Sequence, residues 1–313
     1  MTAPGTEQPL SVSVVIPCRG HAKELDACLR SLLQQDYSGS FEIIVVDSAA
    51  DDAVLAAGGR YEQVHILRDP GGLLPGEARN LGASRSRARW LAFIDADCVA
   101  QADWLRELLR PLQQQMHLAA GAVGQARHWH PISVIDNMMQ FAGQSPHQPA
   151  ERHKIVASCN IAISRRDFEQ VGGFPATQEA CGEDVLFCYA VNRQWKDAIF
   201  FTPAACVAHQ GRATWRSLWH HQFRFGQARG RLMLELTQAQ RALGRHTWAI
   251  PAVMLRRLGW LAQRTFRNHP LEAAQLALFS PVLMVGLAAW SLGFRAGCRA
   301  ETFNPVAYGD GKT

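Results

Sequence analysis

The sequence predicts an α/β fold, a three-layer α/β/α domain built on a mostly parallel sheet. Between residues 11 and 95, apolar segments of strand length alternate with helical segments in the order strand, helix, strand, helix, strand. The segments 41–46 and 90–94 are apolar almost throughout, which is typical of strands that are covered by helices on both faces. Together these two observations indicate repeated βαβ units.

The expected elements follow in order along the chain. Strands are expected at residues 11–16, 41–46, 64–67, 90–95, 155–163 and 198–202. The first strand should stop at Pro17, because proline has no amide hydrogen to donate to a sheet. A helix is expected over 21–36, where leucines recur at core spacing. Residues 127–153, with four histidines at irregular spacing, are expected to form a mobile polar loop.

Composition limits the class of protein. The chain has 313 residues, of which 48% are hydrophobic, so it can bury a large core in one or two domains. Its eight cysteines form no CxxC pair, which argues against a zinc site or a disulfide framework and favours a reducing compartment. The first ten residues are polar and proline-containing, so no secretory signal is expected there.

Charge is distributed unevenly between two regions. Residues 1–211 carry a net charge of −5, whereas residues 212–313 carry 14 basic against four acidic side chains, nearly all of the basic ones arginine. Such a region suits phosphate groups of a nucleotide, a nucleic acid or lipid head groups. Nucleic acid is disfavoured as a partner because no nucleic-acid-binding module accompanies the charge. Within this region, residues 212–244 are expected to be helical, either as a lid over a pyrophosphate or as an amphipathic helix packed under the sheet.

Two carboxylates, Asp95 and Asp97, follow directly after the apolar segment 90–94. Residues i and i+2 of a strand point to the same side, so both can reach one site at the carboxyl edge of the sheet. Acidic oxygens there suit Mg²⁺ or Mn²⁺ shared with substrate phosphates. The alternative is a solvated pair of turn aspartates. Asp47 ends the second strand at the same edge, where it can accept hydrogen bonds from a base or ribose, or cap the helix that follows.

A second acidic pair, Glu183 and Asp184, follows Gly182 at the start of a predicted helix. Carboxylates in a first helical turn are stabilised by the helix dipole, so simple capping is the plainest interpretation of this pair. The same dipole is expected to keep the pKa of Asp184 low. A catalytic interpretation needs further support from the rest of the chain.

The ordered motifs resemble the inverting, nucleotide-sugar-dependent glycosyltransferases of family 2, which have the GT-A fold. The resemblance covers residues 10–211 and rests on the order of many short motifs: Val14-Val15-Ile16-Pro17, Ile44-Val45-Val46-Asp47, Gly76-Glu77-Ala78-Arg79-Asn80, Phe93-Ile94-Asp95-Ala96-Asp97, Asn160-Ile161-Ala162-Ile163, Gly172-Gly173-Phe174, Gly182-Glu183-Asp184 and His209. Each motif alone is weak evidence; their order is what carries the resemblance.

The resemblance implies roles for these positions. The residues that would bind the nucleotide sugar are Pro17, Asp47, Arg79, Asp95 and Asp97. Asp47 would contact the base, and Arg79 would lie on the nucleotide side. Mn²⁺ or Mg²⁺ would be held by Asp97 and His209 together with Asp95. Asp184 would be the catalytic base, with Glu183 beside it in the acceptor region.

Two departures from the family pattern affect these expectations. The second strand ends in Asp47-Ser48-Ala49-Ala50 where the family often has Asp-Asp-Gly-Ser, so the contacts of this loop with a nucleotide are in doubt. Processive members carry Gln-x-x-Arg-Trp, whereas this chain has Gln222-Phe223-Arg224-Phe225. Transfer of a single sugar is therefore favoured over polymer synthesis.

The chain is expected to divide into a catalytic domain, 1–211, and a basic helical region, 212–313. The segment 273–294 carries no formal charge and is long enough to span a membrane. An interfacial hairpin is the alternative. Arginines before this segment would face anionic lipid, so the expected location is the cytoplasmic face of a membrane.

The sequence therefore predicts a metal-dependent inverting transferase. It would move a sugar from a nucleotide-sugar donor to a hydroxyl acceptor, lipid-linked or part of a cell-envelope glycan. The alternatives are a nucleotidyltransferase acting on sugar phosphates, which would release pyrophosphate, and an inactive membrane-tethered protein that only binds sugar nucleotides.

Overall fold

A mixed sheet of nine strands forms the centre of the computed structural model, which describes residues 10–177, 181–232, 238–266 and 269–300. The strands are β1 Val12–Cys18, β2 Phe41–Asp47, β3 Val64–Arg68, β4 Trp90–Ile94, β5 Cys98–Ala100, β6 Leu118–Gln125, β7 Glu151–His153, β8 Asn160–Ser164 and β9 Ile199–His209. Their order is β3-β2-β1-β4-β8-β6-β9-β5, with β7 paired to β9. The first four strands are parallel, as predicted, whereas β8 runs antiparallel to both β4 and β6.

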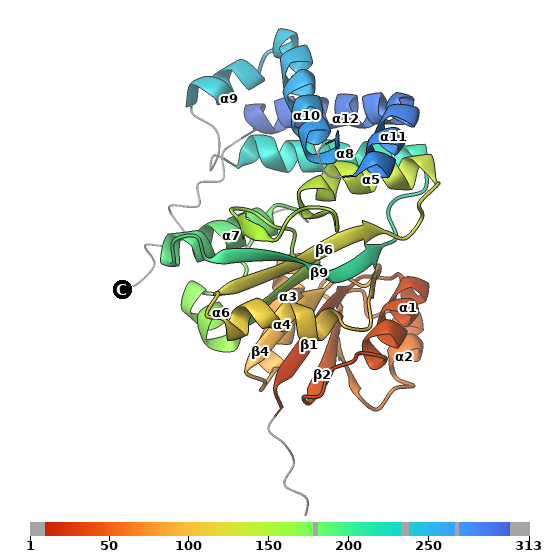
Figure 1. Cartoon of the computed structure of the whole chain (residues 1–313), viewed down its shortest axis with the longest axis vertical. Helices are drawn as coiled ribbons and strands as arrows, with labels where there is room; N and C mark the ends of the chain where they lie inside the picture. The colour runs from red at the N-terminus through yellow and green to blue at the C-terminus, as the bar shows by residue number, and fades with distance from the viewer. Residues whose placement is uncertain (1–9, 178–180, 233–237, 267–268, 301–313) are drawn as a thin grey trace, which may run out of the picture.

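Helices cover both faces of this sheet. On one face, α1 (Ala22–Leu33), α2 (Asp52–Gly58) and α4 (Trp104–Gln113) bury their apolar sides against the strands. On the other face lie α3 (Pro75–Arg85), α6 (Arg165–Val171) and α7 (Glu183–Gln194). Figure 1 shows the resulting three layers, which confirm the predicted α/β/α architecture.

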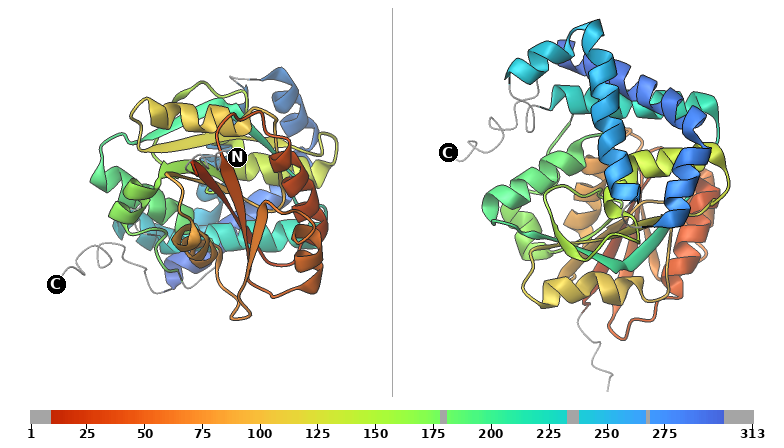
Figure 2. Two further views of the ribbon diagram at one scale, coloured as in Figure 1. Left: turned by 90° about the horizontal axis from the view of Figure 1, so that it is seen from below. Right: turned by 45° about the horizontal axis from the view of Figure 1, so that its top comes forward.

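A helical layer stacks on this domain (Figures 1 and 2). It consists of α5 (Pro131–Phe141), α8 (Trp215–Arg231), α9 (Gln238–Gly244), α10 (Ile250–Phe266), α11 (Pro270–Leu278) and α12 (Ser280–Arg299). The predicted mobile loop over 127–153 is wrong, because Ile135, Met138 and Met139 of α5 are buried against the C-terminal helices. Their helical spacing was the signal, and the surrounding histidines obscured it.

The apolar segment 273–294 is divided between two helices. The chain turns at Phe279, and Pro281 lies in the first turn of α12. Within the described residues, α12 is the one helix long and apolar enough to cross a membrane, but 61% of its apolar window is buried inside the protein.

The burial of α12 results from close contact with α8. Gly226 of α8 faces the backbone of α12 so tightly that a Cβ there would lie 1.9 Å from the carbonyl oxygen of Trp290. Gly293 makes the reciprocal approach, and its Cβ would lie 1.9 Å from the carbonyl oxygen of Phe223. Because α8 packs against α12 and α5, the expectation that it packs under the sheet is wrong. Its role as a lid stays a prediction.

Three strands differ from the expected boundaries, and β5, β6 and β7 were not predicted. The strand expected at 155–163 is β8, which begins only at Asn160. Pro17 lies inside β1, opposite Val46 of β2, and is tolerated because the pairing of β1 with β4 already ends at Val15. Residues 198–202 and 207–209 belong to one strand, β9, whose pairing with β6 shifts register after Gly121. The side chain of Asn160 bridges this irregularity by donating to the carbonyl oxygens of Ala122 and Ala205, at 2.8 and 2.9 Å.

Candidate active site

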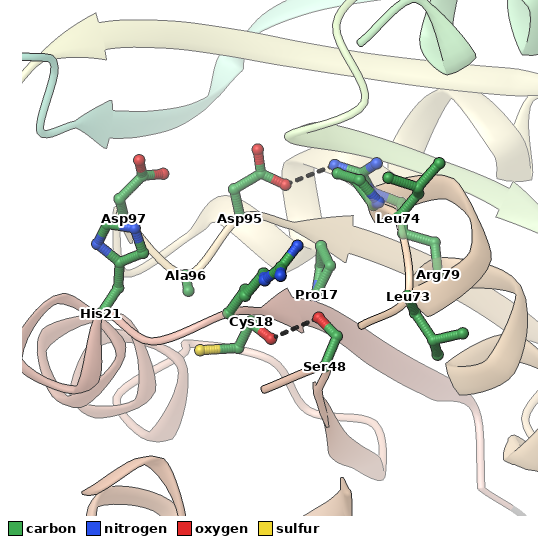
Figure 3. A pocket seen from close by; sticks show the side chains of 12 residues that line it. Pro17, Cys18, His21, Ser48, Leu73, Leu74, Arg79, Asp95, Ala96 and Asp97 are labelled. Atoms are coloured by element: carbon green, nitrogen blue, oxygen red, sulfur yellow. Dashed lines mark hydrogen bonds and ion pairs between the residues drawn. The ribbon is translucent and has the colours of Figure 1, made fainter. Parts of the chain in front are cut away.

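A pocket lies where the parallel strands β1, β2 and β4 end at the same edge of the sheet. Its twelve lining residues are Pro17, Cys18, Arg19, His21, Ser48, Leu73, Leu74, Pro75, Arg79, Asp95, Ala96 and Asp97. Figure 3 shows Asp95 and Asp97 along one side of the pocket and Ser48 below them. This edge is where open α/β sheets bind ligands, and four predicted residues (Pro17, Arg79, Asp95 and Asp97) line the pocket.

Asp47 lies beneath the pocket wall and is fully buried. One carboxylate oxygen, Oδ1, accepts a hydrogen bond from the amide of Ala49 at 3.1 Å, and the other, Oδ2, has no hydrogen-bond partner but lies 3.9 Å from Nε of Arg68. The helix that follows is capped by Asp51, so capping does not explain Asp47. A buried, unsatisfied carboxylate oxygen is costly, and it is chemically suited to accept an N–H of a nucleotide base.

Arg79 of α3 joins the pocket to the second acidic pair. Its guanidinium is buried, and it donates to Oδ1 of Asp95 at 2.7 Å and to Oε1 of Glu183 at 3.0 Å. Burial lowers the pKa of Arg79, but the two carboxylates more than offset this effect, so its pKa lies above the ordinary value and the side chain stays charged. The guanidinium of Arg79 thereby links the start of α7 to the pocket.

Asp97 faces His209 instead. Its Oδ2 lies 3.5 Å from Nε2 of His209 and 3.6 Å from Nη1 of Arg212. Burial raises the pKa of Asp97, but the positive charges of His209 and Arg212 outweigh it, so this pKa lies well below its usual range. Burial lowers the pKa of His209, but the neighbouring Asp97 raises it by more, so this pKa lies above its ordinary value. Asp97, His209 and Arg212 thus form an ionic cluster.

The predicted metal ligands come together only in part. Among the described residues, no three His, Cys, Asp or Glu side chains converge as metal ligands. Asp97 and His209 share a site because β5, which follows Asp97, pairs with β9, which ends at His209. Asp95 instead accepts a hydrogen bond from Arg79, drawn as a dashed line in Figure 3. Two protein ligands suit Mg²⁺ or Mn²⁺ that also binds a diphosphate.

Asn137 and Arg212 belong to this site and were not predicted from the sequence. Oδ1 of Asn137 lies 3.1 Å from Nδ1 of His209, and the amide of Gly211 donates to the same nitrogen at 3.2 Å. These contacts hold the imidazole so that Nε2 faces Asp97. Asn137 was missed because it lies on α5, in the segment expected to be a loop.

Glu183 and Asp184 begin α7, after Gly182 in the left-handed conformation (φ 100°). Glu183 is buried and accepts a hydrogen bond from Arg79. Oδ1 of Asp184 accepts a hydrogen bond from the amide of Val185 at 2.8 Å. The expectation of a low pKa for Asp184 is wrong. Burial, and then the neighbouring charge of Glu183, raise its pKa to about 7, and these effects exceed the stabilisation from the helix start.

The residues at this edge provide the groups needed for one type of chemistry. Asp47, with one carboxylate oxygen that has no hydrogen-bond partner, lies buried beneath the pocket, and Asp97 at the pocket edge pairs with His209. A carboxyl group that titrates near neutrality, Asp184, is adjacent to Glu183, which Arg79 ties to the pocket. A carboxyl group with a pKa near neutrality, linked to a pocket at the carboxyl edge of the sheet, suits group transfer to a hydroxyl.

Comparisons with known proteins agree with this chemistry. The family model described as Glycosyl transferase family 2 matches residues 13–172. The glycosyltransferase AglE of Haloferax volcanii is 23% identical over 88% of this chain and 90% of its own length. The pre-mycofactocin glycosyltransferase of Mycobacterium tuberculosis is 28% identical over 66% of this chain but only 44% of its own.

A solved structure supports the fold. The crystal structure of GalNAc-T7 with UDP, GalNAc and Mn²⁺ has a TM-score of 0.52 and 17% sequence identity, and the match covers 65% of this chain and 44% of that one. This similarity confirms the expected GT-A-like fold. The present chain spans less than half of two of these three relatives.

Proposed function

The chain belongs to glycosyltransferase family 2, and from this premise we propose that it is a metal-dependent inverting enzyme that transfers one sugar from a nucleotide-sugar donor to a hydroxyl acceptor. The observation that carries the proposal is the Arg79 bridge, which ties the donor pocket at Asp95 to the Glu183–Asp184 pair. A donor pocket and a base held together in this way are what a direct displacement requires.

The donor would occupy the pocket at the carboxyl edge of the sheet. Oδ2 of Asp47, buried and without a hydrogen-bond partner, would accept an N–H of the base. Ser48 and Pro17 line the pocket, and Asp95, which accepts a hydrogen bond from Arg79, would contact the ribose side of the nucleotide. Asp97 and His209 would hold Mn²⁺ or Mg²⁺, which when bound stabilises the negative charge of a departing diphosphate.

Asp184 would act as the general base. It accepts the proton of the acceptor hydroxyl as that oxygen forms a bond to the anomeric carbon of the sugar. The bond from this carbon to the diphosphate breaks, and its electron pair leaves with the nucleoside diphosphate. Attack opposite the leaving group inverts the anomeric centre. A carboxyl pKa of about 7 leaves a large ionised fraction at neutral pH and gives a base much stronger than an ordinary aspartate.

The acceptor is proposed to be lipid-linked or part of a cell-envelope glycan, with the enzyme at the cytoplasmic face of a membrane. Support comes from the arginine-rich C-terminal region and from the apolar helices α10 to α12. The absence of the Gln-x-x-Arg-Trp motif continues to favour transfer of a single sugar.

The metal site gives the first prediction. Asp97→Ala removes one of two proposed ligands, so the affinity for UDP or GDP measured by calorimetry with Mn²⁺ should fall by at least tenfold, to the value seen with EDTA. Asp103→Ala, an exposed aspartate of the same domain, is the control and should bind like the wild type. Equal nucleotide affinity of the wild type with Mn²⁺ and with EDTA would contradict the proposed metal site.

A further inference from the structure

Helices α10 and α11 carry an apolar face on their outer side. In α10 the exposed positions Ala252, Leu255, Gly259 and Phe266 follow one another at helical spacing. In α11 the exposed positions Leu271, Ala274 and Leu278 do the same. Leu255 and Leu278 are 68% and 65% exposed. Figure 2 shows α10 crossing the outside of the α8–α12 pair, with α11 beside it.

Apolar side chains therefore lie on both sides of α10, with Arg256 and Gln263 between them on the exposed side. Leu261 and Thr265 face inward and are buried, and Trp260 packs against the core that α5 and α12 share. The outward side has no such partner within the described residues. A helix that is apolar on its buried side and also on its exposed side is typical of a surface that meets a second apolar phase.

The charge of this region specifies what that phase is. Between residues 238 and 300 the chain has eight arginines and a single acidic residue, Glu272. The carboxylate of Glu272 is turned inward, where it accepts a hydrogen bond from Oγ of Ser145 at 2.8 Å. Arg256, next to Leu255, is exposed. The exposed Arg256 can meet an anionic lipid head group directly, and the excess positive charge of the surrounding helices adds a longer-range attraction.

The packing of α12 excludes the simplest other mode of membrane contact. A span by α12 would have to separate it from α8, whose backbone lies against its own at Gly226 and Gly293. The two helices would lose this packing as well as the buried contacts of Trp290 and Phe294. Membrane contact through the outer face of α10 and α11 requires no such rearrangement.

We infer that the outer face of α10 and α11, formed by Leu255, Phe266, Leu271 and Leu278, lies on a bilayer that contains anionic phospholipid, while α12 stays packed within the protein. This inference deepens the proposed function, on which it rests, because it gives the enzyme a route to a lipid-linked acceptor. The apolar side chains enter the boundary between head groups and acyl chains, and the arginines remain at the head groups.

The test is co-sedimentation of the full chain with vesicles of phosphatidylcholine, alone or with phosphatidylglycerol. The wild type should bind the anionic vesicles, and binding should weaken as salt is raised. Leu255→Gln with Leu278→Gln should reduce the vesicle affinity by roughly tenfold for each leucine. Leu55→Gln is the matched control, because Leu55 is 41% exposed on α2 in the catalytic domain, and it should bind like the wild type.

Several results would overturn the inference. The first is a wild-type protein that does not bind anionic vesicles, and the second is a double variant that binds them as well as the wild type does. The third is a protein that can be extracted from cell membranes only with detergent, as expected for a membrane-spanning helix. A stable dimer that the double variant dissociates, without vesicle binding, would assign the face to a second copy instead. Donor hydrolysis by the double variant, measured without vesicles, should equal that of the wild type. Failure of vesicle binding is thereby distinguished from failure of the proposed function.

Discussion

Asp184→Asn should leave donor binding nearly intact while the rate of sugar transfer falls by roughly 10²- to 10⁴-fold, the scale of losing a general base. Asparagine keeps the shape of the side chain and removes the proton acceptor. The wild-type rate at low substrate should rise with pH and level off above an apparent pKa of about 7, because only the ionised carboxylate accepts the proton. The variant should lack this rise.

The same substitution should also change how the melting temperature depends on pH, which a simple capping role does not predict. The pKa of Asp184 is raised in the folded protein, so the folded state retains a proton that the unfolded state has lost between pH 4 and 7. The stability from this carboxyl is complete at low pH and is lost as the pH rises towards 7. The melting temperature of Asp184→Asn relative to the wild type should therefore increase over this range and stay constant above it.

Asp197→Asn provides the control, since Asp197 is exposed beyond the end of α7 and touches none of these groups. It should transfer sugar at the wild-type rate. If Asp184→Asn transferred normally and melted lower than the wild type at pH 8, Asp184 would be a helix-capping residue and the catalytic assignment would fail.

Arg79→Met should lower the free energy of unfolding by about 3–5 kcal/mol, the usual cost of removing one partner from a buried ion pair. Glu183 would remain buried without a counter-charge, and Asp95 would lose its 2.7 Å contact. Donor affinity should fall too, because Arg79 donates the hydrogen bond that holds the Asp95 side chain at the pocket edge. Urea unfolding and nucleotide calorimetry measure the two effects.

Two comparisons make the Arg79 prediction specific. Arg106→Met removes an arginine that also contacts carboxylates, but its side chain is 48% exposed, so the loss should stay below about 1 kcal/mol. Adding Glu183→Gln to Arg79→Met should restore part of the stability, since it removes the uncompensated buried charge. A loss in Arg79→Met no larger than in Arg106→Met would show that the bridge does not hold the site together.

The sequence was sufficient for the α/β domain because its strands are read from local apolar runs. The segments 41–46 and 90–94 are buried as expected, and the residues that follow them meet at one sheet edge by topology alone. The reversed direction of β8 could not be predicted, since strand direction depends on partners distant in the sequence.

Site residues were predicted better than their pairing. Asp95 and Asp97 were expected to bind one metal, but Arg79, sixteen positions before Asp95 in the chain, draws Asp95 to a different partner. The pKa of Asp184 was expected to be low because the local helix start is visible in the sequence, whereas the burial that raises the pKa is not. Local signals were reliable wherever no distant side chain competed with them.

The most direct measurement of the central claim needs no knowledge of the acceptor. The full chain, supplied with Mn²⁺ and a panel of α-linked nucleotide sugars, can be followed by proton NMR while water replaces the acceptor. For the donor that it uses, the account predicts release of a nucleoside diphosphate and β-anomeric sugar as the first product, both abolished by EDTA and slowed by Asp184→Asn. Release of α-anomeric sugar first, or of pyrophosphate, would contradict it.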